Sequence, residues 1–345
     1  MKHVPLPFWA KWNADLKAVA PQNFVLLGEL LDGDPSLVAQ AWSGGGFTSM
    51  FDFPLGFAMG DVFCRGDSPA KLAAVLTNDR RYPDASKLVT LLDNHDLPRI
   101  MSVCGGDVDK VRAALAFMIT TRGVPSIIWG TEVGMDGPKE PDNRKSMTFT
   151  SHPLKGELAF WLDARKKNPA LSDGVPVVLS ATSEGVVLGR IAGSQLAVIV
   201  VGRDGVRPTV PGGAWAEASK ELVPPLGWKR PSIGVFVSAV KPGAYAGLVA
   251  ANEPQWRTGA KKRSITFEGP AGALLVGSGP EFGDWNPAKA LRLPITLELP
   301  IGGAFEFKAI RREGEKTIWD SKVNETLFVD EVGKGSVVLR PSFPR

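Results

Sequence analysis

Apolar and polar residues alternate along the first half of the chain in a rhythm of short strands and longer helices. Residues 8–20 have apolar side chains at helical spacing and end before Pro21, which predicts an amphipathic helix. Further helices are predicted over 69–77, 107–121 and 154–166. Four short apolar runs have the length of buried parallel strands: Phe24–Leu27, Ser49–Pro54, Lys87–Leu92 and Val124–Trp129. This alternation predicts a parallel sheet covered by helices.

The pattern changes near residue 170. Four short β-rich runs, broken by Gly and Pro, predict a small antiparallel β-sandwich. They are Val177–Leu179, Val186–Leu188, Leu196–Val201 and Gly234–Val237. Residues 241–263 are rich in Gly, Ala and Pro and predict a linker. A second β-rich block runs from Ser264 to the end, so the predicted fold is α/β followed by all-β.

Composition and charge exclude several classes of protein. Hydrophobic residues make up 44% and charged residues 22%, as in ordinary globular proteins. The net charge of +4 is spread thinly, and its densest cluster, residues 261–263, lacks interleaved aromatics, so we expect no nucleic-acid partner. Since no window approaches the ~20 apolar residues of a membrane span, we expect no membrane partner. The first residues have no apolar signal segment, so the protein is either cytoplasmic or begins further upstream.

Cysteine and histidine are scarce. Cys64 and Cys104 allow at most one internal disulfide, and we interpret both as small, partly buried side chains. Three histidines without a CxxC pattern predict no metal site.

Acidic residues follow three of the four predicted parallel strands. The first strand leads into Gly28-Glu29, the third into residues 93–96, and the fourth into Gly130-Thr131-Glu132. Functional side chains of parallel barrels gather at the carboxyl ends of strands, so these acids predict a shared site. The alternative is that each acid only caps the following helix. We would favour it if a single strand ended in this way, but not when three of the four strands do.

These segments, in this order and spacing, resemble the α-amylase family of glycoside hydrolases over residues 1 to about 165. The matching segments are FVLLGELLDG (24–33), LDNHDLPR (92–99), GVPSIIWGTEVGM (123–135) and DNR (142–144). The resemblance implies that Glu29 is the general acid/base. It also implies that His95 and Asp96 bind sugar hydroxyls and stabilise the transition state. Arg99 is either a substrate-binding residue or a helix-start residue paired with a neighbouring acid.

The family's nucleophile does not fall within the resemblance. The chain opens with a segment in which Lys2 and His3 match the tail of the pattern G-x-R-x-D-x-x-K-H and are expected to bind substrate. The nucleophilic aspartate would then fall just before Met1. We therefore expect about four C-terminal βα units of an eight-stranded barrel and an inactive isolated chain, because the retaining mechanism needs two carboxyl groups. Asp52 is the obvious substitute, in a position where the family has a structural residue.

The last block is similar to the starch-binding domain of carbohydrate-binding module family 20, over about 264–345. The matching residues include GDWNP (283–287) and FEFK (305–308). The resemblance implies an aromatic platform of Trp285 and Trp319, with hydrogen bonds from Lys308 and Asn324. Sugar C–H faces stack on flat rings, although one tryptophan of the pair can instead be a half-buried strand residue.

The sequence thus predicts a starch-binding protein derived from a retaining α-amylase-type hydrolase. Its partners would be starch, maltooligosaccharides or related α-glucans, together with the missing N-terminal half or a second copy. The alternatives are a non-catalytic starch-binding protein and one half of a split hydrolase or transglycosylase. We expect no cofactor; the resemblance leaves calcium open for a full-length relative, which is expected to be secreted or periplasmic. The expected units are 1–168, 169–243, the linker 244–263, and 264–345.

Overall fold

Four short parallel strands form the centre of the N-terminal part. The computed structural model describes residues 1, 3–203, 208, 220–228, 233–239, 261–330, 333 and 335–344. β1 pairs with β2 and β3 pairs with β4, both in parallel, and a parallel bridge between Phe51 and Val89 joins the two pairs. The strands are β1 (Leu27–Gly28), β2 (Ser49–Met50), β3 (Val89–Thr90) and β4 (Val124–Pro125). Each of the four predicted strands is present, but shorter than its apolar run.

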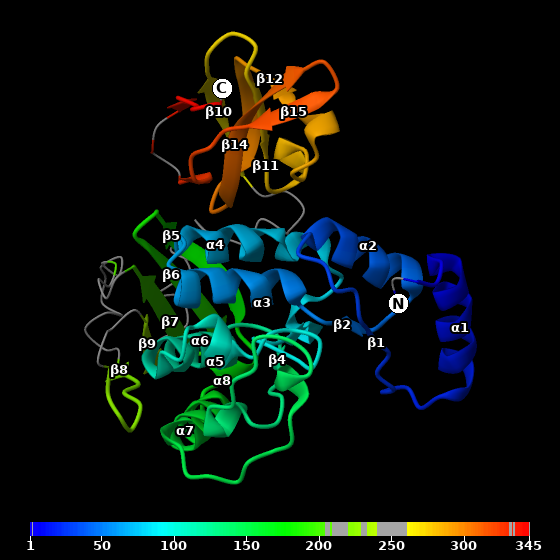
Figure 1. Ribbon diagram of the computed structural model, residues 1–345, viewed down its shortest axis with the longest axis vertical. Helices are drawn as coiled ribbons and strands as arrows, with labels where there is room; N and C mark the ends of the chain where they lie inside the picture. The colour runs from blue at the N-terminus through cyan, green and yellow to red at the C-terminus, as the bar shows by residue number, and fades with distance from the viewer. Residues whose placement is uncertain are drawn as a thin grey trace.

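Helices cover these strands (Figure 1). Three of them confirm predicted segments: α4 (Ala70–Thr77), α6 (Val108–Thr120) and α7 (Pro153–Lys167). The first predicted helix is α1 (Leu6–Val19), which ends before Pro21 as expected. The remaining α-helices, which the sequence pattern did not predict, are α2 (Pro35–Gly45), α3 (Phe53–Met59), α5 (Ile100–Val103) and α8 (Pro169–Ser172).

Helix α3 replaces the end of a predicted strand. Asp52 caps it by accepting a hydrogen bond from the Leu55 N–H at 3.2 Å, so the apolar residues after Asp52 turn into a helix. Gly56 lets this helix lie against the sheet, because a Cβ there would stand 2.8 Å from the Leu91 carbonyl oxygen. A buried helix and a buried strand have similar apolar runs, which explains the error.

The described residues between 175 and 239 form one antiparallel sheet in the order β5-β6-β7-β9-β8. Val186 and Leu188 pack into the large core shared with α4, α6 and α7, while Val187 and Val198 form a smaller cluster on the other face. The predicted second layer of a sandwich is not found among the residues described here, so the sandwich stays a prediction. The strands are β5 (Val175–Ala181), β6 (Gly185–Ala192), β7 (Gln195–Gly202), β8 (Lys220–Glu221) and β9 (Ile233–Ala239).

Two further sheets form the C-terminal unit, which we define as the described residues of 261–344. One has the order β13-β10-β17; the other has the order β12-β11-β14-β15, with β16 also paired to β14. Phe267, Phe282 and Phe307 pack edge to face or stacked in the core between them. The strands are β10 (Lys262–Glu268), β11 (Leu274–Gly277), β12 (Leu291–Arg292), β13 (Ile295–Pro300), β14 (Ala304–Glu313), β15 (Lys316–Trp319), β16 (Glu325–Phe328) and β17 (Ser336–Val338).

The predicted linker was wrong at its end. Residues 244–260 lie outside the described residues, but Lys262 and Arg263 belong to β10, where they pair with Pro300 and Leu299. Arg263 also forms an ion pair with Asp330 at 2.9 Å. The short basic run therefore has strand partners, which a composition argument does not detect.

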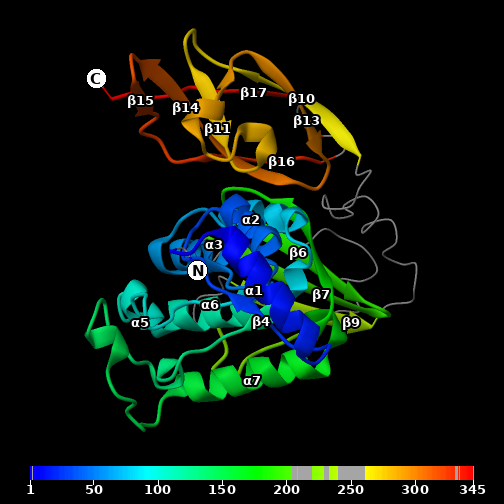
Figure 2. The same ribbon diagram turned by 90° about the vertical axis from the view of Figure 1, so that its right-hand side faces the viewer.

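The C-terminal unit packs against helix α4, on the side of the molecule away from α7 (Figures 1 and 2). Ala304 of β14 lies in the same core as the helices, and its N–H donates to the Thr77 hydroxyl at 3.0 Å. Because both groups are buried, this bond fixes one point of the contact.

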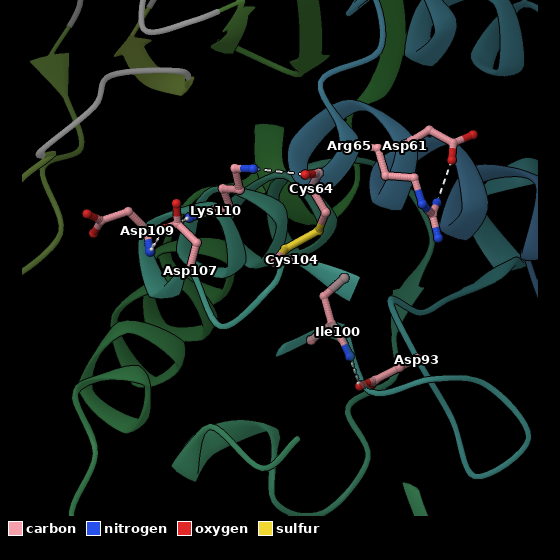
Figure 3. Close-up of a disulfide and its surroundings, with 9 residues drawn as sticks. All are labelled: Asp61, Cys64, Arg65, Asp93, Ile100, Cys104, Asp107, Asp109 and Lys110. Atoms are coloured by element: carbon pink, nitrogen blue, oxygen red, sulfur yellow. Dashed lines mark hydrogen bonds and ion pairs between the residues drawn. A yellow bond between two sulfur atoms is a disulfide. The ribbon is translucent and has the colours of Figure 1, made fainter. Parts of the chain in front are cut away.

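Cys64 and Cys104 form the one internal disulfide that the sequence allowed, so they are not merely small, partly buried side chains (Figure 3). A π-helical turn over Gly60–Arg65 carries Cys64, and Cys104 ends α5, with Cα atoms 4.3 Å apart. Folding alone brings these residues together, because 40 positions separate them. Among the described helices, none has the length and apolar content needed to cross a membrane.

Candidate functional site

The predicted catalytic residues follow strands whose carboxyl ends lie on one edge of the parallel sheet. Glu29 comes directly after β1, and Asp96 lies in the loop after β3. The Glu29 side chain is half-buried and has no hydrogen-bond partner among the residues that the structure describes. Its backbone carbonyl accepts a bond from the Met1 ammonium at 3.1 Å, which places His3, an exposed residue, on the same side. Lys2, the other predicted substrate-binding residue of this segment, lies outside the described residues.

The loop after β3 is held by the motif at 142–144. The Asn143 side-chain amide donates to the carbonyl oxygens of His95 at 2.9 Å and Leu97 at 3.1 Å. Arg144 forms an ion pair with Asp96 at 2.6 Å, and the His95 ring nitrogen Nε2 lies 3.3 Å from the same carboxylate. His95 and Asp96 remain exposed, so both are accessible to a ligand. Arg144 was not among the predicted site residues, although its motif was recognised.

Arg99 has the structural role that the sequence left open as an alternative. Its side chain is fully buried and lies 3.4 Å from the Asp93 carboxylate. It also donates to the Trp129 carbonyl oxygen and lies over the Trp129 ring, 5.8 Å from its centre. A buried guanidinium with these partners is not free to bind sugar hydroxyls, which corrects the substrate-binding prediction for this residue.

Asp52, the proposed substitute nucleophile, is fully buried in an ion-pair network. The Arg122 guanidinium bonds both Asp52 and Asp79, with its Nε donating to Asp79 at 2.7 Å. Burial raises the pKa of Asp79 to about 6, an effect that Arg122 opposes. Burial alone would lower the pKa of Arg122. The charges and hydrogen bonds of Asp52 and Asp79 outweigh this effect, so the pKa of Arg122 lies above its usual value. Asp52 therefore faces a permanent cation and a helix N-terminus, not a solvent-accessible site.

Asp93 is also a framework residue. Its carboxylate accepts a hydrogen bond from the Ile100 N–H at 2.6 Å, at the start of α5 (Figure 3). Burial raises its pKa, while the bond to Ile100 and the charge of Arg99 lower it. This confirms the expectation that Asp93 caps or hydrogen-bonds the segment that follows it.

Trp285 and Trp319 lie next to each other on the C-terminal unit, as the sequence predicted. Their ring centres are 6.5 Å apart and the ring planes are inclined by 36°. Trp319 ends β15 and is 37% exposed, while Trp285 is half-buried. Two neighbouring rings that reach solvent offer flat surface to a sugar ring.

The turn that carries Trp285 is held in an uncommon backbone conformation. Asp284 and Trp285 both have φ at 56°, in the left-handed region that residues with a Cβ rarely adopt. The Trp285 N–H donates to the Gly277 carbonyl at 2.8 Å, and the Asp284 carboxylate pairs with Arg81 of the N-terminal part. Such strain persists where surrounding contacts fix it, and it is found most often at ligand sites.

The two predicted polar partners are on nearby strands. Lys308 lies in β14 opposite Val276, and Asn324 directly precedes β16; both are half-buried. The Asn324 side chain bonds the Glu306 carboxylate, whose pKa is raised chiefly by burial and lowered by Lys71 of α4 and by Asn324. Glu306 was not predicted as a site residue, since a lone acidic residue in a strand gives no sequence signal.

Comparisons with known proteins give separate matches for the N-terminal part and for the C-terminal unit. Residues 5–169 match the catalytic domain of alpha amylase, and residues 272–338 match the starch binding domain. A cyclomaltodextrinase of Geobacillus thermopakistaniensis is 30% identical over 216 residues, which are 59% of this chain and 36% of that protein. A beta/alpha-amylase of Paenibacillus polymyxa is 33% identical over 186 residues, which are 50% of this chain and 14% of that protein.

A solved structure shares the arrangement along almost the whole chain. The gamma-CGTase of alkalophilic Bacillus clarkii superposes with a TM-score of 0.58 at 18% identity, covering 99% of this chain and 67% of that one. The chain thus has an α-amylase-like fold followed by an all-β C-terminal region, and it spans about a third or less of the curated relatives above. The matches agree with the resemblance to the α-amylase family of glycoside hydrolases, family 13, over residues 5–169, and to the starch-binding domain of carbohydrate-binding module family 20 over residues 272–338.

Proposed function

We propose that this chain binds starch-like α-glucans through its C-terminal unit and that the 345-residue polypeptide does not by itself hydrolyse them. The adjacent rings of Trp285 and Trp319 carry the binding part of this proposal. A pyranose ring presents C–H groups to such a surface, and Lys308 and Asn324 supply a hydrogen-bond donor and an amide for its hydroxyls. Maltooligosaccharides and granular starch are the expected ligands.

The catalytic part concerns the carboxyl groups. A retaining glycosidase uses a protonated carboxyl group and a carboxylate about 5–5.5 Å apart. Glu29 is the proposed acid/base, and Asp96, together with His95, is the proposed clamp on sugar hydroxyls. Asp52 and Asp93, the carboxylates after the second and third strands, are both buried and bonded to arginine or to a helix N-terminus. Neither is placed to attack an anomeric carbon, and Asp96 is paired with Arg144.

The same proposal covers the finer architecture. We interpret residues 1–168 as four C-terminal βα units of an eight-stranded barrel, and residues 169–243 as a small β unit of sandwich type. His3 and Lys2 would complete the sugar-binding edge next to Glu29. Further strands would cover the open sides of the parallel strands, whether they belong to the same polypeptide, to a second one or to a second copy of this chain, because unpaired strand edges pair readily.

An active enzyme is the second candidate, because Glu29 follows β1 and His95 and Asp96 follow β3, and the carboxyl ends of these parallel strands lie on one edge of the sheet. Release of reducing ends from soluble starch separates the two possibilities. We expect no release above that of the Glu29→Gln variant. Robust turnover that Glu29→Gln abolishes would overturn the proposed inactivity and leave the binding proposal intact.

Sedimentation with granular starch tests binding. The purified chain is expected to sediment with the granules, and Trp285→Ala combined with Trp319→Ala is expected to remain in solution. Trp12→Ala is the matched control, since Trp12 is an exposed tryptophan on α1, outside the C-terminal unit. Retention of the double variant on starch would exclude the aromatic platform.

A further inference from the structure

A cavity of about 370 Å³ lies where the C-terminal unit meets helices α3 and α4. We call it the inter-unit cavity. The C-terminal unit contributes Trp285, Glu306 and Asn324 to its wall, and the helices contribute Phe57, Lys71 and Val75. Its volume falls within the ~300–1,000 Å³ typical of small-molecule sites. Two of the predicted sugar-binding residues, Trp285 and Asn324, thus face the N-terminal part as well as solvent.

Charged contacts hold the two walls of the inter-unit cavity together. Arg80 forms a two-pronged ion pair with Glu281 at 2.8 and 2.6 Å, and Arg81 pairs with Asp284, the residue before Trp285. The side chains of Arg80 and Glu281 are only 13% and 20% exposed, so water screens this pair little. Planar guanidinium–carboxylate pairs of this type fix orientation as well as distance.

The chemistry of the wall favours a neutral, hydroxyl-rich ligand. Four carboxylates line the inter-unit cavity, at Asp34, Asp61, Asp284 and Glu306, whereas the lining ammonium of Lys71 is already paired with Asp61 and Asp67. Asp61 and Asp284 are themselves paired with Lys71 and Arg81, so the described lining residues offer no unpaired cation to an anionic ligand such as a phosphate. Carboxylates accept hydrogen bonds from hydroxyl groups, and Trp285 and Phe57 offer ring surface to the C–H faces of a sugar.

We propose that the inter-unit cavity is a glucan subsite shared by the two units. An α-glucan that lies on Trp285 continues into this cavity and contacts Phe57 and Val75 of the α-amylase-family part. The inference rests on the proposed binding of glucans by the C-terminal unit and extends it to residues 53–75. Since the ligand touches both walls, it also stabilises the packing of one unit on the other.

A side chain that fills the inter-unit cavity from the helix side tests this subsite. Val75→Trp adds an indole to the α4 wall and leaves Trp285 and Trp319 in place. Titration calorimetry with maltoheptaose on the full chain is expected to show at least tenfold weaker binding. Leu162→Trp is the matched control, because Leu162 is exposed on α7, on the far side of the molecule. The control is expected to bind like the unchanged protein.

The outcomes separate this inference from the function on which it rests. Suppose that maltoheptaose binds the unchanged protein, that Trp285→Ala weakens this binding, and that Val75→Trp does not. The shared subsite is then wrong, and the proposed glucan binding stands. If the unchanged protein does not bind, or Trp285→Ala and Trp319→Ala bind normally, the proposed function itself fails.

Hydrogen exchange of the unchanged protein gives an independent test should Val75→Trp not fold. Maltoheptaose is expected to slow amide exchange in α3 and α4 as well as in the turn at 283–287. Protection confined to the C-terminal unit would overturn the shared subsite.

Discussion

Four acidic residues that follow strands β1, β2 and β3 fall into two groups with different partners. Asp52 and Asp93 are buried, and each is bonded to an arginine and a helix N-terminus. Glu29 and Asp96 reach solvent; within the described part of the chain Glu29 has no ion-pair partner, whereas Asp96 pairs with the exposed Arg144 and lies next to His95. Sequence position alone does not distinguish the groups, since all four residues lie at or just after strand ends.

The difference shows what a strand-end carboxylate needs in order to act on a ligand. A buried carboxylate with a fixed cation is part of the framework, because moving it would leave an uncompensated charge in a region of low dielectric constant. An exposed carboxylate exchanges water for a ligand at little cost. Substitutions in the two groups should therefore differ sharply in their effect on stability. Four predictions test this contrast, and they are given from the largest expected effect to the smallest.

Replacing the buried cation should have the largest effect. Arg122→Met leaves Asp52 and Asp79 buried without their partner, so we expect the free energy of unfolding to fall by about 3–5 kcal/mol. Urea unfolding followed by circular dichroism measures it. Arg144→Met, which removes the exposed partner of Asp96, should cost about 1 kcal/mol or less. Equal losses in the two variants would contradict the division into groups.

Removing the disulfide should be the next largest effect. Cys64 belongs to the turn that precedes α4 and Cys104 ends α5, so the bond ties two segments of the buried framework. We expect Cys64→Ser with Cys104→Ser to lower the free energy of unfolding by about 2–4 kcal/mol, because the unfolded chain gains freedom. A reducing agent should produce the same loss in the unchanged protein and none in the double variant.

The pH dependence of stability should report the buried network. The pKa of Asp79 is about 6 in the folded protein, against about 3.9 for an unperturbed aspartate. Between these values the folded state binds more protons, so the contribution of Asp79 to stability is present below about pH 4 and is lost as pH rises through about 6. Asp79→Asn should remove this component from urea unfolding curves measured between pH 4 and 6. If the free energy of unfolding of Asp79→Asn depends on pH as it does in the unchanged protein, a group other than Asp79 titrates in this range.

Substitution of an exposed strand-end acid should have the smallest effect on stability. Asp96→Asn breaks one surface ion pair, so we expect a change of less than about 1 kcal/mol in the free energy of unfolding. A loss above about 2 kcal/mol, measured by the same urea titration, would move Asp96 into the framework group.

The predictions from sequence succeeded where a pattern is local and long. Helices α4, α6 and α7 and the runs of β5, β6, β7 and β9 follow from periodicity, and GDWNP placed Trp285 in a turn. Helix α3 was missed because its apolar residues continue a strand-like run, and only the bond from Leu55 to Asp52 ends the strand. The extent of the second parallel strand was overestimated for the same reason.

The sequence by itself determined which family motifs are present and in what order, because strand-end residues and turn residues are specified locally. It named Glu29, His95 and Asp96 at one edge and the tryptophan pair on the C-terminal unit. Only the tertiary structure decided that Arg99 and Asp52 are framework residues, that Cys64 meets Cys104, and that Trp285 faces helices α3 and α4. Burial, ion pairing and the meeting of distant segments depend on how the elements pack together, and no local pattern encodes them.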